Sequence, residues 1–288
     1  MSGIEKGNFS EYDLTPEEWR ERLEAKAGRI LWEDPERLVK EMTDEELAKG
    51  PEERTGNSSA QEVERHCVLR YATEKDFDGI KAANMDRWRF RAKEYNCEKY
   101  KKEQFTEENE ANLREQLSED SVSERDFKSS CLVLTVNGEV AGYVEFGPGL
   151  KKLEKFEKFV DDTTAQIYTI SVLEKFQKNG FGVILLEDAI LEAEKELHAE
   201  KVILGTQEEN EGGMALYTGK KQGFGFEQAD RQFDEKRSGL DEQGNEVKNE
   251  GKWMKWNLKT KAWEDRKCYW LCLSLDIKKW KEKQAEKN

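Results

Sequence analysis

The sequence predicts an α+β (α/β mixed) fold in which strands and helices mix along the chain, preceded by a helical N-terminal extension. Three observations lead to this fold class. An Asn-Gly pair joins two apolar runs at 131–136 and 139–146, a pattern typical of a tight β-hairpin. Alternating residues at 166–172 lead through a glycine-containing turn into an amphipathic helix at 180–197. The first 65 residues differ in composition and carry their own helix-start signals.

Residues 1–62 are expected to form an acidic helical extension that ends in a linker. The first 65 residues contain 18 acidic and 10 basic residues, and therefore more than half of the formal net charge of −14. Thr15, followed by Pro16 and Glu18, has the pattern of a helix start with a capping box. The simplest interpretation is a helical appendage that packs on the main domain or is partly mobile. Recruitment of a protein partner is the weaker alternative.

The main domain is expected to span residues 63–278, with an insertion at about 234–262 and a basic tail at 279–288. Further predicted elements are a strand at 67–71, a helix after Thr73, a strand at 201–206, a helix at 211–222, and strand-like segments at 224–233, 253–258 and 269–275. Either of the last two segments can close the main sheet, and the later one is favoured.

Charge and composition exclude several function classes. The net charge of −14 disfavours duplex DNA and anionic membranes as partners, whereas it permits cationic partners such as amines. No apolar run reaches the roughly 18–20 residues of a membrane span, and no signal-peptide pattern is visible. Five scattered cysteines and two histidines argue against a disulfide framework and a metal site. We therefore expect a cytoplasmic protein without a metal.

The most informative segment for function is the turn Gln177-Lys178-Asn179-Gly180-Phe181-Gly182, which opens the helix at 180–197. Two glycines let the backbone approach a ligand, and the N–H groups at a helix start form an anion site suited to a pyrophosphate. The turn is neither a Walker loop nor a G-x-G-x-x-G fingerprint. By itself, a tight strand-to-helix connection explains it equally well.

This turn resembles the Q/R-x-x-G-x-G/A signature of the GNAT superfamily of N-acetyltransferases, in which the pyrophosphate of acyl-CoA lies on the turn. The order of the surrounding elements agrees, because a hairpin precedes the signature strand, while Asn210, Tyr217 and Gly223-Phe224 follow the signature helix. The resemblance covers about residues 66–233. It implies a mostly antiparallel central sheet with helices on both faces. In this fold the signature strand and the strand after its helix splay apart around the pantetheine arm.

The resemblance also implies acetyl-CoA as the co-substrate and a set of residues that bind it. Backbone groups of Ile170 and Val172 would bind the pantetheine arm like an added strand, and Asn210 would contact the same arm. The pyrophosphate would be held by the turn and the first helical residues, namely Gln177, Lys178, Asn179, Gly180, Phe181, Gly182 and Val183.

Two residues are the expected catalytic groups. Tyr217 would protonate the departing thiolate, as the family's tyrosine often does, although its ring can instead simply close the helix onto the sheet. Some family members carry a glutamate base at the position of Gln166, which cannot accept a proton at neutral pH. Glu145 on the preceding strand is the substitute by location. An exposed strand carboxylate with no catalytic role and a water chain are the alternatives.

The implied reaction is acetyl transfer to a primary amine of a small molecule or peptide by direct attack. A catalytically inactive acyl-CoA-binding protein of the same fold is the alternative, supported by Gln166. The expected partner is the amine substrate, without nucleic acid or membrane, and a homodimer is left open. Residues 150–164 would form a lid near the acceptor or a solvated helix. Several aromatic residues would line an amine pocket or pack in the core, namely Trp88, Phe90, Tyr95 and Tyr100.

Overall fold

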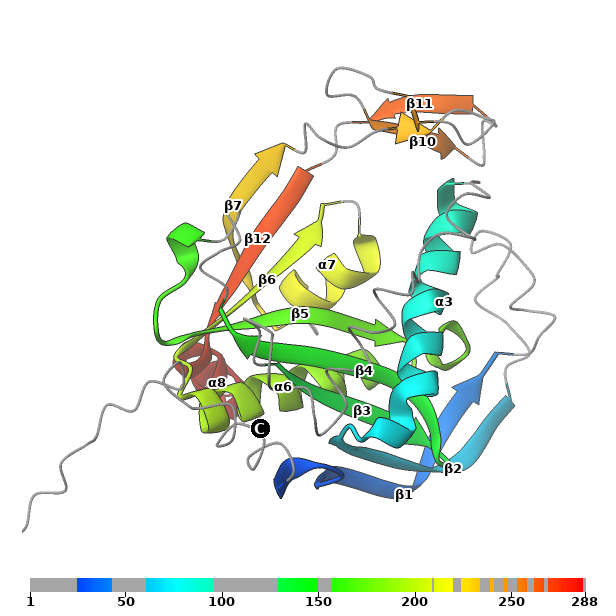
Figure 1. The fold of residues 1–288 in the computed structure, drawn as a ribbon, viewed down its shortest axis with the longest axis vertical. Helices are drawn as coiled ribbons and strands as arrows, with labels where there is room; N and C mark the ends of the chain where they lie inside the picture. Colours follow the sequence, from blue (N-terminus) through cyan, green and yellow to red (C-terminus); the bar gives the residue numbers. More distant parts are fainter. Residues whose placement is uncertain are drawn as a thin grey trace, which may run out of the picture.

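The computed structural model describes residues 25–42, 61–95, 129–149, 157–208, 210–219, 224–233, 239–240, 246–247, 253–257, 262–266 and 269–286. Its centre is an eight-stranded mixed sheet in the order β1-β2-β3-β4-β5-β6-β12-β7 (Figure 1). The strands are β1 (Ile30–Glu41), β2 (Gln61–Tyr71), β3 (Ser130–Val136), β4 (Glu139–Pro148), β5 (Thr164–Val172), β6 (Lys201–Gln207), β7 (Glu227–Phe233) and β12 (Tyr269–Asp276). Only the β5–β6 pair is parallel, so the expected mostly antiparallel sheet is confirmed.

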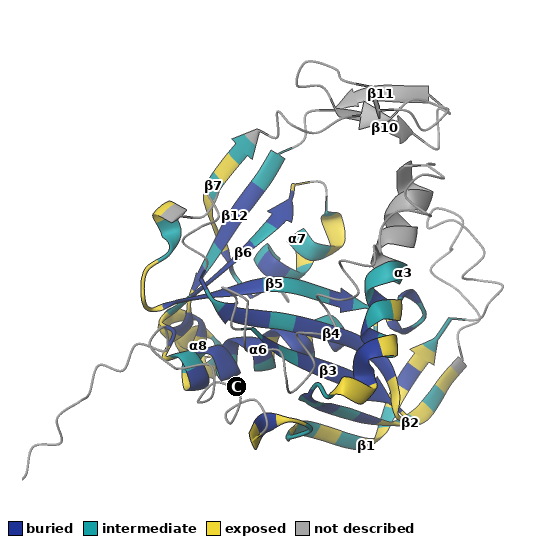
Figure 2. Cartoon of the chain, in the orientation of Figure 1, coloured by how far each residue is buried: buried dark blue, intermediate teal, exposed yellow. Residues whose placement is uncertain are grey.

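Helices cover both faces of this sheet, as expected (Figure 1). The α-helices are α3 (Phe77–Tyr95), α6 (Phe181–Leu197), α7 (Glu211–Thr218) and α8 (Ile277–Ala285), and the short 3-10 turns are η2 (Glu74–Asp76), η3 (Glu157–Phe159) and η4 (Glu174–Phe176). On one face, Ile80 and Ala83 of α3 pack against Val133 and Tyr143. On the other face, α6 contributes to the larger apolar cluster, and Figure 2 shows that the central strands are buried almost throughout.

The hairpin predicted from the Asn-Gly pair is confirmed as β3–β4. Asn137 and Gly138 both adopt positive φ angles, 49° and 83°, as a primed two-residue turn requires. The turn joins β3 to β4, and their pairing runs from Val136 opposite Glu139 to Ser130 opposite Phe146. The described part of the chain contains no helix that is long and apolar enough to cross a membrane.

The predicted helical extension is wrong for residues 30–41, which form β1 at one edge of the sheet. β1 pairs antiparallel with β2, and two register irregularities interrupt this pairing, between Ile30 and Trp32 and between Asp34 and Arg37. Such irregularities break the alternation of apolar and polar residues by which a strand is recognised. Pro35 lies within the second one, and proline is tolerated at an edge strand. The helix start at Thr15 lies outside the described residues.

The later of the two candidate C-terminal segments closes the sheet, as favoured from the sequence. β12 lies between β6 and β7, whereas β10 (Trp253–Asn257) pairs with β11 (Ala262–Arg266) in a separate hairpin. A further short pair joins β8 (Gly239–Leu240) and β9 (Glu246–Val247). The segment between β7 and β12 therefore spans residues 234–268 and adds two small hairpins to the domain.

The basic C-terminal segment is a packed helix rather than a solvated tail. Ile277 and Trp280 of α8 are buried, and the Trp280 ring stacks on Phe224 with 5.8 Å between ring centroids. Other expectations fall outside the description, because residues 150–156 and Tyr100 are not described, nor are the side chains of Trp88, Phe90 and Tyr95. The lid and the aromatic amine pocket therefore stay predictions.

Candidate active site

β5 and β6 run side by side for only four residues and then diverge. Their parallel pairing extends from Thr164 opposite Lys201 to Ile167 opposite Leu204. Beyond this point β6 continues along β12, whereas β5 continues along β4. In Figure 1 the two strands separate like the arms of a V, and α7 lies next to the opening.

A β-bulge in β5 coincides with the point of divergence. Glu145 and Phe146 are neighbours on β4, but their partners on β5 are Thr169 and Ile167, so Tyr168 is an extra residue. A bulge bends its strand and increases the local twist. The Tyr168 hydroxyl donates to the carbonyl of Pro148, which ties the bulge to the neighbouring strand. The bulge therefore gives a structural reason for the divergence of β5 from β6.

Beyond the bulge, backbone polar groups of β5 face the side on which β6 no longer pairs with it. The N–H of Leu173 donates to the Ala141 carbonyl on β4, with 2.8 Å between nitrogen and oxygen. Because backbone groups alternate in direction along a strand, those of Val172 and Ile170 point away from β4. The side-chain amide of Gln177 donates to the Val172 carbonyl at 3.2 Å. The backbone groups of Ile170 and Val172 therefore face away from β4, and their role in binding a pantetheine arm stays a prediction.

The turn after β5 ends in a helix start without a side-chain cap. Lys178 and Gly180 both have left-handed φ angles, 65° and 79°, and Gly180 is the N-cap of α6. The first turn of α6 contains no acidic residue. The N–H groups of the next residues, Phe181 and Gly182, point out of the helix end, as the first N–H groups of a helix do. This helix start has the properties of an anion site, and a phosphate fits it.

Asn179 has a different place from the one expected. Its side-chain oxygen accepts the N–H of Lys40, and its amide donates to the Lys40 carbonyl, both at 2.8 Å. The same amide also donates to the Phe176 carbonyl at 3.0 Å. Asn179 therefore joins β1 to the turn, and its side chain is engaged with the backbone of β1 rather than directed to a ligand.

A residue that the sequence reasoning missed lies at the same turn. The Arg37 guanidinium on β1 donates to the Asn179 carbonyl, with 3.2 Å between nitrogen and oxygen. The sequence offered no signal for this proximity, because it depends on the strand that was predicted as a helix. The anion site thus has one wall, β1, that lies outside the segment covered by the resemblance.

Asn210 and Tyr217 come together on α7. Asn210 is the N-cap of this helix, since its side-chain oxygen accepts the N–H of Gly213 at 3.1 Å, while its amide donates to the Thr206 hydroxyl at 3.1 Å. Gly213 lies between the side chains of Asn210 and Tyr217. A Cβ atom at this position would lie 2.4 Å from the Asn210 amide nitrogen and 3.1 Å from the Tyr217 ring. Asn210 therefore has a structural task at the start of α7, and contact with a pantetheine arm stays a prediction.

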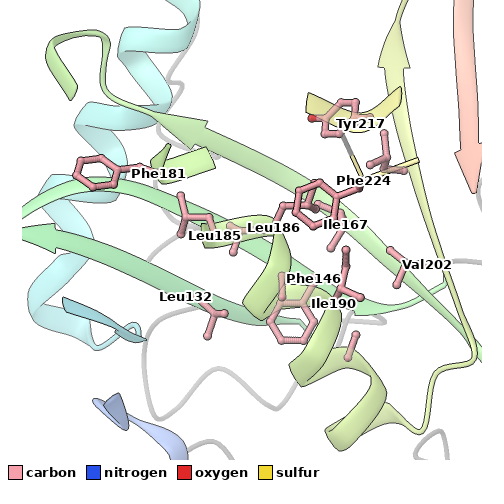
Figure 3. Packing of buried hydrophobic residues seen from close by; sticks show 14 of the residues in the cluster. Leu132, Phe146, Ile167, Phe181, Leu185, Leu186, Ile190, Val202, Tyr217 and Phe224 are labelled. Atoms are coloured by element: carbon pink, nitrogen blue, oxygen red, sulfur yellow. The ribbon is translucent and has the colours of Figure 1, made fainter. Parts of the chain in front are cut away.

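Tyr217 is a largely buried residue, with 6% of its surface exposed. Its ring meets Phe226 edge-on, with 6.0 Å between centroids. Figure 3 shows Tyr217 beside Phe224 at one end of the apolar cluster and Phe181 at the other end. The ring therefore has a structural role, because it closes α7 onto the sheet. The role of Tyr217 as an acid stays a prediction.

Glu145 and Gln166 occupy different places on the sheet. Glu145 is half-buried on β4, opposite Thr169, and the Ser129 hydroxyl donates to its carboxylate at 2.9 Å. Tyr143, two residues earlier on the same strand, packs under α3, so Glu145 lies on the face that α3 covers. Gln166 is 4% exposed and lies opposite Gly147. Glu145 is therefore the more accessible of the two, although its catalytic role is untested.

Two further kinds of chemical group bear on the site, the thiol of Cys131 and the possible metal ligands among the described residues. Cys131 lies opposite Glu145, and burial, together with the charge of Glu145, raises the pKa of its thiol well above the ordinary value. The thiol is therefore protonated at neutral pH and is a poor nucleophile. Within the described ranges, no group of three or more His, Cys, Asp or Glu side chains is placed to hold a metal ion.

Comparisons with known proteins agree with this geometry. Residues 88–224 match the model of the acetyltransferase (GNAT) family. A search of curated proteins found no match. Similar solved structures include an N-acetyltransferase from Staphylococcus aureus Mu50, with 16% identity over 73% of this chain and 98% of that chain and a TM-score of 0.46.

Two further solved structures are also similar to parts of this chain. The ribosomal-protein-S18-alanine N-acetyltransferase from Escherichia coli has 16% identity over 73% of this chain and 94% of that chain, with a TM-score of 0.43. The PaiA N-acetyltransferase from Thermoplasma acidophilum, in complex with coenzyme A, has 15% identity over 57% of this chain and 91% of that chain, with a TM-score of 0.40. The segment that matches the acetyltransferase (GNAT) family model, residues 88–224, contains the hairpin, the bulged strand and the uncapped helix start.

Proposed function

We propose that this protein is an acetyl-CoA-dependent N-acetyltransferase that acts on a primary amine of a small molecule or peptide. One observation carries the proposal: in a segment that matches the GNAT family model, a bulged strand that has parted from its neighbour leads directly to an uncapped helix start. The two features adjoin because the turn between them is short. They offer adjoining places for an extended thioester arm and for its phosphates.

The cofactor-binding residues follow from these two places. The pantetheine arm of acetyl-CoA, which supplies the acetyl thioester, would lie along Ile170 and Val172 in the manner of an added strand. Its phosphates would meet the N–H groups of Gly180, Phe181 and Gly182, whereas the Val183 N–H donates to the Gly180 carbonyl at 3.0 Å. The left-handed φ of 79° at Gly180 supports this arrangement, since a residue with a side chain is strained in that conformation.

Three groups of the chain would serve the chemistry. A backbone N–H in the segment Ile170–Val172 would donate to the thioester oxygen as negative charge develops on it. Tyr217 would donate its hydroxyl proton to the departing sulfur. Glu145, on the face that α3 covers, would accept the proton of the amine directly or through water, and the Ser129 hydroxyl would orient its carboxylate.

A second candidate function rests on Gln166. This residue stands where some family members have a carboxylate, and its amide side chain does not accept a proton at neutral pH. Its presence favours an acyl-CoA-binding protein that has lost catalysis. The two functions differ in a single observable, because both bind CoA but only the enzyme releases free thiol from acetyl-CoA when an amine is present.

The test is therefore an assay of free-thiol release from acetyl-CoA. The full chain is incubated with acetyl-CoA and a panel of primary amines that covers diamines, amino acids and peptides with free N-termini. Amine-dependent thiol release above the hydrolysis rate supports the enzyme. CoA binding by calorimetry without transfer to any amine supports the binding protein, and the absence of CoA binding contradicts both.

A further inference from the structure

Arg37 lies beside the turn that opens α6, although it belongs to a strand far away in the sequence. Besides donating to the Asn179 carbonyl, its Nη2 atom would be 3.6 Å from a Cβ atom placed on Gly180. The side chain is 28% exposed, so it remains accessible to a ligand. Figure 1 shows the arrowhead of β1 next to the loop that follows β5, consistent with these contacts.

The position of Arg37 is fixed by the protein itself. Its guanidinium carbon lies 5.4 Å from the centre of the Trp32 ring and 5.6 Å from that of Phe181. Two backbone links hold β1 on the turn, through Asn179 and through the Met42 N–H, which donates to the Lys175 carbonyl at 3.1 Å. The guanidinium is therefore held at the helix start before any ligand binds.

The electrostatics of this place are unfavourable without an anion. The N-terminus of a helix carries partial positive charge, so it favours acidic groups and disfavours a guanidinium. The first turn of α6 has no acidic residue and no side-chain cap. Among the described residues, the ion pair of Arg37 is with Asp34, at 3.8 Å between Nη1 and Oδ2, which is the outer limit of such a pair. Positive charge therefore accumulates here in a chain of net charge −14.

We infer that Arg37 binds the pyrophosphate of acyl-CoA, so that the N-terminal strand supplies one wall of the cofactor site; this rests on the proposed function. A guanidinium offers several N–H donors in a planar fork that matches phosphate oxygens. One of them is engaged with the Asn179 carbonyl, and the side chain keeps 28% of its surface exposed beside the helix start. A phosphate at Gly180 would then accept hydrogen bonds from the helix and from β1 together.

The inference is tested by calorimetric titration of the full chain with CoA and with dephospho-CoA, which lacks the 3′-phosphate. Arg37→Gln is expected to raise the Kd of both ligands about tenfold, the loss expected for one charge-assisted hydrogen bond. Arg37→Lys should lose less, because it keeps the charge. The matched control is Arg231→Gln. Arg231 lies on β7, at the edge of the sheet opposite β1, and its guanidinium carbon is 3.6 Å from the centre of the Tyr269 ring. This control should bind like the unmodified protein.

Salt dependence separates phosphate binding from a merely structural role. Raising the NaCl concentration screens a charge contact, so CoA affinity should fall less steeply with salt in Arg37→Gln than in the unmodified protein. Equal slopes with a uniform loss would mean that Arg37 only shapes the turn, and would overturn the inference. Unchanged CoA affinity in Arg37→Gln would overturn it too. So would a loss of affinity for CoA but not for dephospho-CoA, because that result would assign Arg37 to the 3′-phosphate. Absence of CoA binding by the unmodified protein contradicts the proposed function instead.

Discussion

Replacing Asn179 with alanine removes the side chain that joins β1 to the turn before α6. The substitution deletes four hydrogen bonds to the backbone, two with Lys40 at 2.8 Å, one with Phe176 at 3.0 Å and a longer one with Gln177 at 3.4 Å. A hydrogen bond contributes about 1 kcal/mol net, and those near solvent contribute less. The expected loss in the free energy of unfolding is therefore about 2 kcal/mol.

Urea unfolding followed by tryptophan fluorescence measures this loss. Asn179→Asp is the matched variant, because it keeps an acceptor for the Lys40 N–H but turns a carboxylate oxygen towards the carbonyls of Lys40 and Phe176, so its loss should be at least as large. In calorimetry, Asn179→Ala should also bind CoA more weakly, since Arg37 and the turn lose their common support. A change below about 0.5 kcal/mol in Asn179→Ala, the usual range for surface substitutions, would refute the idea that this side chain joins β1 to the turn.

Three further substitutions test other parts of the molecule. Tyr217→Phe should lower kcat for acetyl transfer severalfold or more while the Kd for CoA stays the same; an unchanged kcat would remove Tyr217 from the role of acid. Tyr71→Phe deletes a buried hydroxyl that donates to the Glu192 carboxylate at 2.6 Å, and should lower the free energy of unfolding by about 2 kcal/mol in urea titrations. Asp188→Asn should stabilise the protein at pH 7 but not at pH 4, because burial and the charges of Glu187 and Glu192 raise the pKa of Asp188 to about 6. Above that pH the folded state bears the cost of the charge, so a stability difference that does not grow between pH 4 and pH 7 would contradict this assignment.

Much of the fold and the cofactor turn is readable from local sequence. The Asn-Gly pair specifies its own backbone angles, and Gly180 marks a place where a positive φ is required. The helix at 181–197 and the closing strand at 269–276 carry apolar patterns that tertiary packing leaves unchanged. For the turn and the helix start, interactions within a few residues decide the structure, whereas the closing strand takes its place by pairing with β6 and β7.

Features that depend on pairing between distant segments were not readable. β1 escaped because its two irregularities and Pro35 hide the strand alternation, and only pairing with β2 makes the segment a strand. The bulge at Tyr168 exists only relative to the register of β4. Because β1 was missed, the roles of Asn179 and Arg37 at the turn were missed with it. For α8, the segment was predicted only as a basic tail, although Ile277 and Trp280, which are both buried, stand three residues apart at a helical spacing.

The most direct measurement of the central claim is calorimetric titration with CoA of two glycine variants. Gly180→Glu places a bulky, negatively charged side chain at the helix start. Gly138→Glu is the control, because it lies in the β3–β4 turn and imposes a similar backbone strain, since φ is 79° at Gly180 and 83° at Gly138. The unmodified protein and Gly138→Glu should bind one CoA per chain, and Gly180→Glu should bind none. Equal binding by the two variants would contradict the placement of the CoA phosphates at this helix start.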